Sequence, residues 1–253
     1  MIQEHYYCAV ERAIASLITQ FGETPDLSLC EADLHAAFYQ KLVEYDLLTI
    51  PHVTRDGRRT GLVHREYPTF FAYENGLGAA LGAAHGYYDV AIFNPSFMRT
   101  HNLDVIANAN RERSRALRTL PEQDRPVPLL AAVNLKLLED CTPASLEELE
   151  TDFFDLVRSE PDAQRCYLAV FFRHWETGGE RQQLLSTLER WADNHNHVAI
   201  VCVQSYADDV GRVFGGRYFN VWNHTAPLLP LDSMAPAWSR QAMTYQRGHY
   251  SYL

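Results

Sequence analysis

The sequence contains no apolar run that approaches the roughly 20 consecutive residues required by a membrane-spanning helix. Its first residues, Met1–His5, have neither the basic stretch nor the apolar stretch of a secretory signal peptide. We therefore expect a cytoplasmic protein that does not associate with a membrane.

Cysteines are few and scattered, and no two of them form a C-x-x-C pair. A disulfide framework or a cysteine zinc site would require paired spacing. The sequence indicates neither, and most of the cysteines are expected to be small buried side chains. The five are Cys8, Cys30, Cys141, Cys166 and Cys202.

Positive charge is also scarce, because 22 Lys and Arg residues face 32 Asp and Glu residues, for a net charge of −10. This balance argues against a protein that coats nucleic acid with its whole surface. Two local groups of arginines could still contact a phosphate backbone, or could simply form solvated surfaces. They are Arg55, Arg58 and Arg59 in one group and Arg111, Arg115 and Arg118 in the other.

The spacing of apolar residues predicts an α/β protein. Helices are expected over 4–21, 29–46, 145–159 and 178–194, and strands over 62–73, 87–93, 129–138, 166–172 and 197–203. Asp56-Gly57 predicts a hairpin before the first strand, and Pro68 predicts that this strand lies at an edge or carries a bulge. With no repeat and no linker, we expect a single domain over residues 1–253, ending in a C-terminal extension from 204 to 253.

Three polar residues interrupt two of the apolar strands. Asp89 lies near the start of the 87–93 strand, and Asn134 and Lys136 lie two residues apart in the 129–138 strand. Side chains alternate along a strand, so Asn134 and Lys136 point the same way. A buried lysine is costly without a partner, which can be an acid, a metal-bound oxygen anion or a phosphate.

This arrangement, with Asp89 on one strand and Asn134-Leu135-Lys136 on the next, resembles the PD-(D/E)xK nuclease superfamily. The resemblance covers about residues 30–203. It implies the restriction-endonuclease-like fold, a mixed central sheet flanked by helices, here with an N-terminal helix and a C-terminal extension. It also implies metal-dependent hydrolysis of nucleic-acid phosphodiesters, with Mg²⁺ or Mn²⁺ as the cofactor.

The resemblance assigns a role to each residue of the motif. Asp89 would bind the metal, and Lys136 would position the attacking water or stabilise charge on the phosphate. Asn134 stands where the family usually has a metal-binding acid. Glu66, on the preceding strand, would be an additional acid at the metal.

Two further acids match positions of the same family. Glu31 would be the acid contributed by the first core helix, and Asp152 would match a polar position on the helix after the lysine strand. Glu31 also fits a capping box that begins at Ser28, which is the more ordinary interpretation.

Asn134 is the main departure from the family pattern, because an amide oxygen can bind Mg²⁺ but brings no negative charge. Either Glu66 compensates for the missing acid, or the protein is an inactive relative that acts as a binding or scaffolding subunit of a larger complex, with a protein partner or as a homo-oligomer. A third interpretation is an unrelated α/β protein in which Asp89 caps a strand end and Lys136 extends to solvent.

Overall fold

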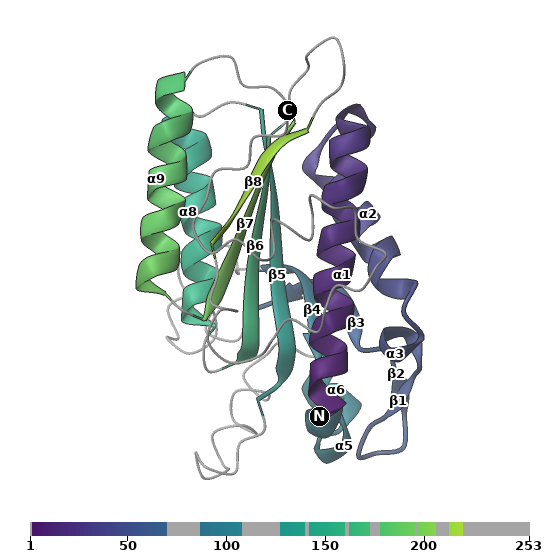
Figure 1. Ribbon diagram of the computed structural model, residues 1–253. Helices are drawn as coiled ribbons and strands as arrows, with labels where there is room; N and C mark the ends of the chain where they lie inside the picture. The colour runs from purple at the N-terminus through teal and green to yellow at the C-terminus, as the bar shows by residue number, and fades with distance from the viewer. Residues whose placement is uncertain are drawn as a thin grey trace.

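A mixed six-stranded sheet forms the centre of the computed structural model (Figure 1). Its strand order is β3-β4-β5-β6-β7-β8, with parallel pairs only between β5 and β6 and between β6 and β7. The strands are β3 (Val63–Pro68), β4 (Tyr87–Phe93), β5 (Leu129–Leu138), β6 (Ala163–Phe172), β7 (Val198–Ser205) and β8 (Val213–Phe219). The structure describes residues 2–69, 87–107, 127–139, 142–159, 162–172, 178–195, 197–205 and 213–219.

Helices cover both faces of this sheet, so the α/β class is confirmed (Figure 1). On one face lie α1 (Ile2–Glu23) and α2 (Glu31–Val43), and on the other lie α8 (Pro143–Arg158) and α9 (Gly178–Asn194). The shorter elements are η1 (Pro25–Leu27), α3 (Asp46–Thr49), α5 (Pro95–Thr100), α6 (Leu103–Ala107) and a hairpin of β1 (His52–Val53) and β2 (Arg59–Thr60). No helix in the described part of the chain has the length and apolar character that crossing a membrane requires.

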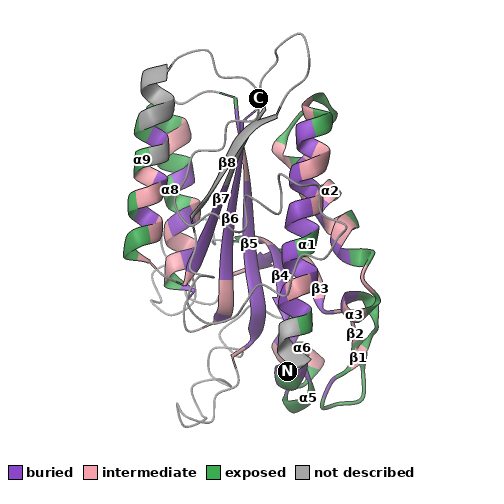
Figure 2. Cartoon of the chain, viewed as in Figure 1, coloured by how far each residue is buried: buried purple, intermediate pink, exposed green. Residues whose placement is uncertain are grey.

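The core lies on both sides of the central strands (Figure 2). Every residue of β5 from Leu129 to Val133 is buried, and so is β6 from Cys166 to Phe172. A strand buried on both faces appears in the sequence as a continuous apolar run, and this explains why these two strands could be predicted. A polar side chain in such a strand must find its partners inside the protein.

A buried polar group ties α1 to the sheet. Glu11, which is 4% exposed, accepts hydrogen bonds from Arg165 Nη1 at 2.6 Å and from the Tyr167 hydroxyl at 3.0 Å. The Arg165 guanidinium also lies over the Tyr7 ring, 3.9 Å from its centroid. These contacts fix α1 on β6, and α1 in turn packs against α2.

Several boundaries differ from those expected. The first strand ends at Pro68 in the described residues, at the edge of the sheet as Pro68 predicted, while residues 70–73 of that prediction lie outside the described ranges. The short helices α5 and α6 and the strand β8 were not predicted. In β8, Gly215 and Gly216 lack the side chains that would show an alternating pattern.

The start of α2 also corrects the predicted capping box. Cys30, rather than Ser28, is the N-cap residue. The carboxylate that completes the capping box belongs to Asp33. Its Oδ2 accepts hydrogen bonds from the backbone amides of Leu29 and Cys30 at 2.8 and 3.0 Å. Glu31 is therefore not needed as a cap, and its side chain is free to turn toward the sheet.

Candidate active site

The sheet opens between β4 and β5. These strands pair only as far as Val90 and Val133. Beyond that point β4 stays paired with β3, and β5 stays paired with β6 up to Leu138. The opening therefore begins at Asp89 on one strand and Asn134 on the other, and it leaves backbone groups of β5 without a neighbouring strand.

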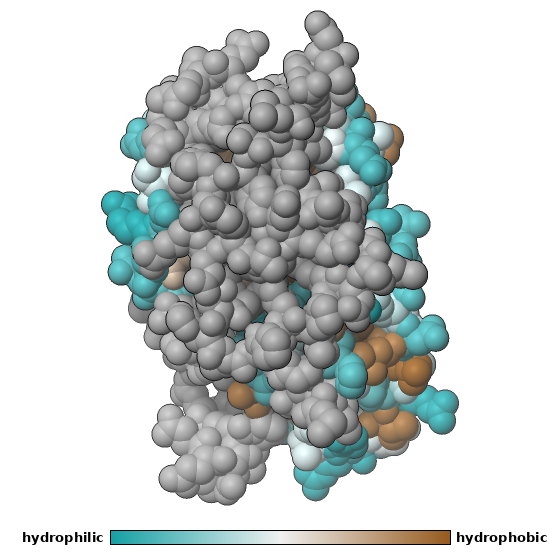
Figure 3. Space-filling view, viewed as in Figure 1, coloured by the Kyte–Doolittle hydropathy of each residue, from teal (hydrophilic) through white to brown (hydrophobic). Residues whose placement is uncertain are grey.

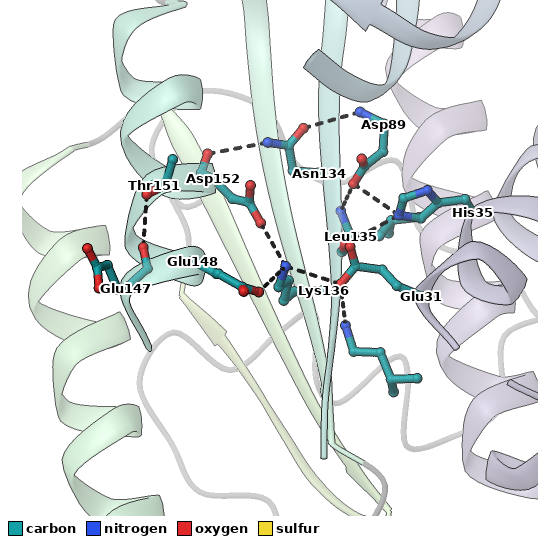
Figure 4. Close-up of polar contacts among 11 residues, drawn as sticks. Glu31, His35, Asp89, Asn134, Leu135, Lys136, Glu147, Glu148, Thr151 and Asp152 are labelled. Carbon is teal, nitrogen blue, oxygen red and sulfur yellow. Dashed lines mark hydrogen bonds and ion pairs between the residues drawn. The ribbon is translucent and has the colours of Figure 1, made fainter. Parts of the chain in front are cut away.

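Side chains from β4 and α2 take the place of the missing strand (Figure 4). The backbone amide of Leu135 donates to Asp89 Oδ2 at 2.6 Å, and that of Leu137 donates to Glu31 Oε2 at 3.3 Å. His35 Nε2 lies 3.5 Å from the Leu135 carbonyl oxygen. Because unpaired buried backbone groups are costly, these contacts explain how the opening is tolerated.

Lys136 points to the α8 side of the opening and is surrounded by acids from two helices (Figure 4). Its Nζ lies 3.4 Å from Glu31 Oε2, 3.2 Å from Glu148 Oε2 and 3.6 Å from Asp152 Oδ2, and the lysine side chain is only 13% exposed. Burial lowers the pKa of Lys136, but these three carboxylates outweigh burial and leave the pKa raised. Lys136 therefore stays charged.

Negative charge exceeds positive charge in this group of residues, which we name the Lys136 cluster. It consists of Glu31, His35, Asp89, Asn134, Lys136, Glu148 and Asp152. Burial is the main cause that raises the pKa of Asp152 to about 7, with repulsion from Asp89 and Glu31 adding to it and Lys136 opposing it. Near neutral pH, Asp152 can therefore gain or lose a proton.

This raised pKa predicts how stability depends on pH. The folded pKa of Asp152 lies above the ordinary value of 3.8, so the folded state binds the proton more tightly than the unfolded state does. The contribution of Asp152 to stability is then lost as the pH rises from about 4 to about 7. We expect Asp152→Asn to remove this loss of stability with rising pH, and to be more stable than wild type at pH 8.

Urea unfolding of wild type and Asp152→Asn across that pH range tests the prediction. Glu148→Gln is the matched control, because Glu148 contacts the same ammonium but is 68% exposed. We expect the control to follow the wild-type profile. Parallel profiles for wild type and Asp152→Asn would contradict the assignment.

Of the residues that sequence reasoning selected for catalysis, three lie together. Asp89, Asn134 and Lys136 are all in the cluster, joined there by Glu31 and Asp152. Glu66 is exposed on β3, and among the described residues it takes part in none of the cluster's hydrogen bonds or ion pairs. Its backbone has a positive φ of 49°.

Asn134 connects the strands and the helix beside the opening through two hydrogen bonds. Its Oδ1 accepts a hydrogen bond from the Asp89 amide and its Nδ2 donates to the Asp152 carbonyl oxygen, both at 3.3 Å, and the residue is 2% exposed. Asn134 thus links β5 to β4 and to α8. Within the described ranges, no group of three or more His, Cys, Asp or Glu side chains is arranged to hold a metal ion.

The hairpin arginines lie away from the cluster. The Arg55 amide donates to the carbonyl of His101, which follows α5, and α5 follows the far end of β4 from Asp89 (Figure 1). Arg58 pairs with Asp56 at 2.6 Å and Asp104 at 2.9 Å, and Arg59 is exposed. The second predicted group, Arg111, Arg115 and Arg118, lies outside the described residues.

Sequence reasoning did not select His35 or Glu148. His35 Nε2 lies 3.3 Å from Asp89 Oδ2. Burial lowers the pKa of His35, but hydrogen bonding and attraction to Asp89, with help from Glu31, leave the pKa raised. Each missed residue is four positions from a selected acid on the same helix, Glu31 or Asp152, and this spacing is the signal that could have found it.

Comparisons of the chain with models of protein families, with curated proteins and with solved structures found no match.

Proposed function

We propose that this protein has a restriction-endonuclease-like fold and hydrolyses nucleic-acid phosphodiesters with a divalent cation, more weakly than a site with a full set of carboxylates would. One observation carries the proposal. Acids from α2 and α8 converge on Lys136 of β5 at the point where the central sheet opens, and there Asp89 of β4 accepts the amide of the adjacent Leu135 (Figure 4). Perturbed pKa values of neighbouring groups, here Lys136 and Asp152, mark a candidate functional site, and excess carboxylates can accept a divalent cation that would in turn attract a phosphate.

The donor chemistry of the cluster suits Mg²⁺ or Mn²⁺, which prefer oxygen ligands. Asp89 accepts both of its contacts through Oδ2, and among the described residues its Oδ1 makes no hydrogen bond. Asp89 would hold the cation together with Glu31 or Asp152, whose carboxylates now face Lys136. When bound, the cation would activate water and neutralise charge that develops on the phosphate.

The chain's own residues have separate tasks in this proposal. Lys136 keeps a positive charge beside the phosphate, and the neighbouring acids that do not bind the cation hold that charge in place. Asp152 can hold or release a proton near neutral pH at its carboxyl oxygen. Asn134 links β4, β5 and α8 but adds no negative charge. The lower charge accounts for the weak hydrolysis that we propose.

Cleavage of single- and double-stranded DNA and RNA, with Mg²⁺ or Mn²⁺ and with neither, tests the proposal. We expect cation-dependent cleavage by wild type and none by Asp89→Asn, which retains the shape of the side chain but not its charge. Glu44→Gln is the control, because Glu44 forms a similar contact with a lysine, Lys41 at 3.7 Å, just after the end of α2. It should cleave at the wild-type rate. Wild type that cleaves none of these substrates would contradict the proposal.

A second candidate is an inactive relative that acts as a binding subunit. Asn134 favours it, because both polar ends of this buried side chain are used to hold the opening. Exposed apolar side chains also favour it, since Ile50 and Val53 are 57% and 46% exposed where hydrophobic surface gathers over α3 and β1 (Figure 3). Absence of cleavage together with self-association in light scattering would support this candidate.

A further inference from the structure

Within the described ranges, Asp89 is held through one oxygen, Oδ2, by groups on β5 and α2. Its Oδ2 accepts the Leu135 amide at 2.6 Å and lies 3.3 Å from His35 Nε2. The Leu135 carbonyl oxygen lies 3.5 Å from the same nitrogen. His35 therefore bridges the carboxylate of β4 and the backbone of β5 across the opening in the sheet.

We infer that His35 is a positioning residue, which fixes Asp89 Oδ2 against β5 and so leaves Oδ1 oriented toward a bound cation. This inference rests on the proposed function, because it assigns His35 to the same site. A ligand held by an outer hydrogen bond loses less conformational freedom when the cation binds, and removal of such a bond typically weakens metal affinity 10- to 100-fold.

The contacts of the imidazole identify which nitrogen carries the proton. Both neighbours of Nε2, a carboxylate oxygen and a carbonyl oxygen, are acceptors, so Nε2 must be the donor. The neutral and the charged ring can both supply this N–H, and the positioning role needs only the donor. The side chain is 13% exposed, so water is a poor substitute for it.

Two conservative variants separate the donor from the bulk of the ring. The amide nitrogen of His35→Gln reaches about as far as Nε2 and can donate to Asp89. The amide nitrogen of His35→Asn reaches only as far as Nδ1 and cannot. Both variants are polar and of similar size, so they differ chiefly in the contact under test.

Calorimetric titration of Mn²⁺ into the wild-type protein and these variants tests the inference, and thermal unfolding of each checks the fold. We expect His35→Asn to bind Mn²⁺ about 10- to 100-fold more weakly than wild type, and His35→Gln to recover most of the affinity. His197→Ala is the control. His197 Nε2 makes a similar contact with the carbonyl oxygen of Val157 at 3.0 Å, away from the cluster. It should bind Mn²⁺ as wild type does.

The outcomes distinguish this inference from the proposed function. Equal Mn²⁺ affinity in wild type and His35→Asn would overturn the positioning role and leave the proposed function intact, even if His35→Asn unfolds at a lower temperature. Equal weakening in His35→Asn and His35→Gln would also overturn it, since the donor would then be irrelevant. A wild-type protein that binds no Mn²⁺ would overturn both.

Discussion

Lys136→Met is expected to lose cation-dependent cleavage and to be less stable by about 2 kcal/mol at pH 8. Methionine retains much of the length of lysine but leaves three carboxylates without their shared cation. Breaking a buried ion pair costs roughly 3–5 kcal/mol. The expected cost is lower here because Glu31, Glu148 and Asp152 are 35%, 68% and 33% exposed, so water partly replaces the ammonium.

The destabilisation should also depend on pH. Asp152, whose pKa is raised to about 7 beside Lys136, will bind a proton still more readily in the variant. The loss should therefore be larger at pH 8, where the folded state must keep carboxylates charged, than at pH 5, where Asp152 is protonated. Urea unfolding at the two pH values measures the difference.

Lys41→Met provides the matched control for this variant. Lys41, in the last turn of α2, forms an ion pair at 3.7 Å with Glu44, the C-cap residue that follows the helix, and pairs of this kind contribute about 0.3–0.5 kcal/mol. We expect Lys41→Met to show a small, pH-independent change. If Lys136→Met were as stable as wild type at pH 8, Lys136 would not be the charge that holds the acids together.

Asn134→Asp is expected to make the stability of the folded protein depend strongly on a bound divalent cation. The new carboxylate can still accept the Asp89 amide, but its second oxygen replaces the nitrogen that donates to the Asp152 carbonyl. Two oxygens then face each other in a site that is 2% exposed, beside acids already in excess. Without a cation we expect a loss on the order of 1–3 kcal/mol, the usual cost of an unsatisfied buried polar group.

If the proposed function holds, a divalent cation should reverse this loss, because the new carboxylate adds a charged oxygen ligand beside Asp89. Binding only to the folded state stabilises it by about 2.7 kcal/mol when the ligand concentration is 100 times its Kd. Thermal unfolding at increasing Mn²⁺ concentration should therefore show a larger rise in Tm for Asn134→Asp than for wild type.

Asn94→Asp is the matched control for this gain. Asn94 is 4% exposed, accepts the Ser96 amide and donates to the Val127 carbonyl, both at 3.0 Å, so it has the same bonding pattern as Asn134. It should lose stability and gain nothing from Mn²⁺. An equal response of the two variants to Mn²⁺ would show that the effect does not come from the Lys136 cluster.

Strand alternation and burial explain the part of the site that could be predicted. Asp89, Asn134 and Lys136 interrupt apolar runs. Because a buried polar side chain is costly without a partner, the sequence predicts that each has one. The strands that carry them, β4 and β5, are neighbours as expected. The position of Glu31 illustrates the limit. Sequence spacing fits both a cap and a site acid, and only the structure shows that Asp33 takes the capping role.

Other features depend on contacts that local sequence does not record. The separation of β4 from β5 after Val90 and Val133 depends on tertiary packing, and His35 lies across this opening. The contact of Glu148 with Lys136 depends on how α8 packs on the sheet. Glu66 has the right residue type on the right strand, yet its side chain is exposed. Arg58 likewise fits a phosphate contact in the sequence but is paired with two acids in the fold.

The most direct test of the central claim is an anomalous difference map from crystals of the wild-type protein grown with Mn²⁺. The proposed function predicts one strong peak beside Asp89 Oδ1, with a carboxylate of Glu31 or Asp152 turned from Lys136 toward it. An empty map at the Lys136 cluster, with Lys136 still held by its three acids, would contradict a cation-dependent site there.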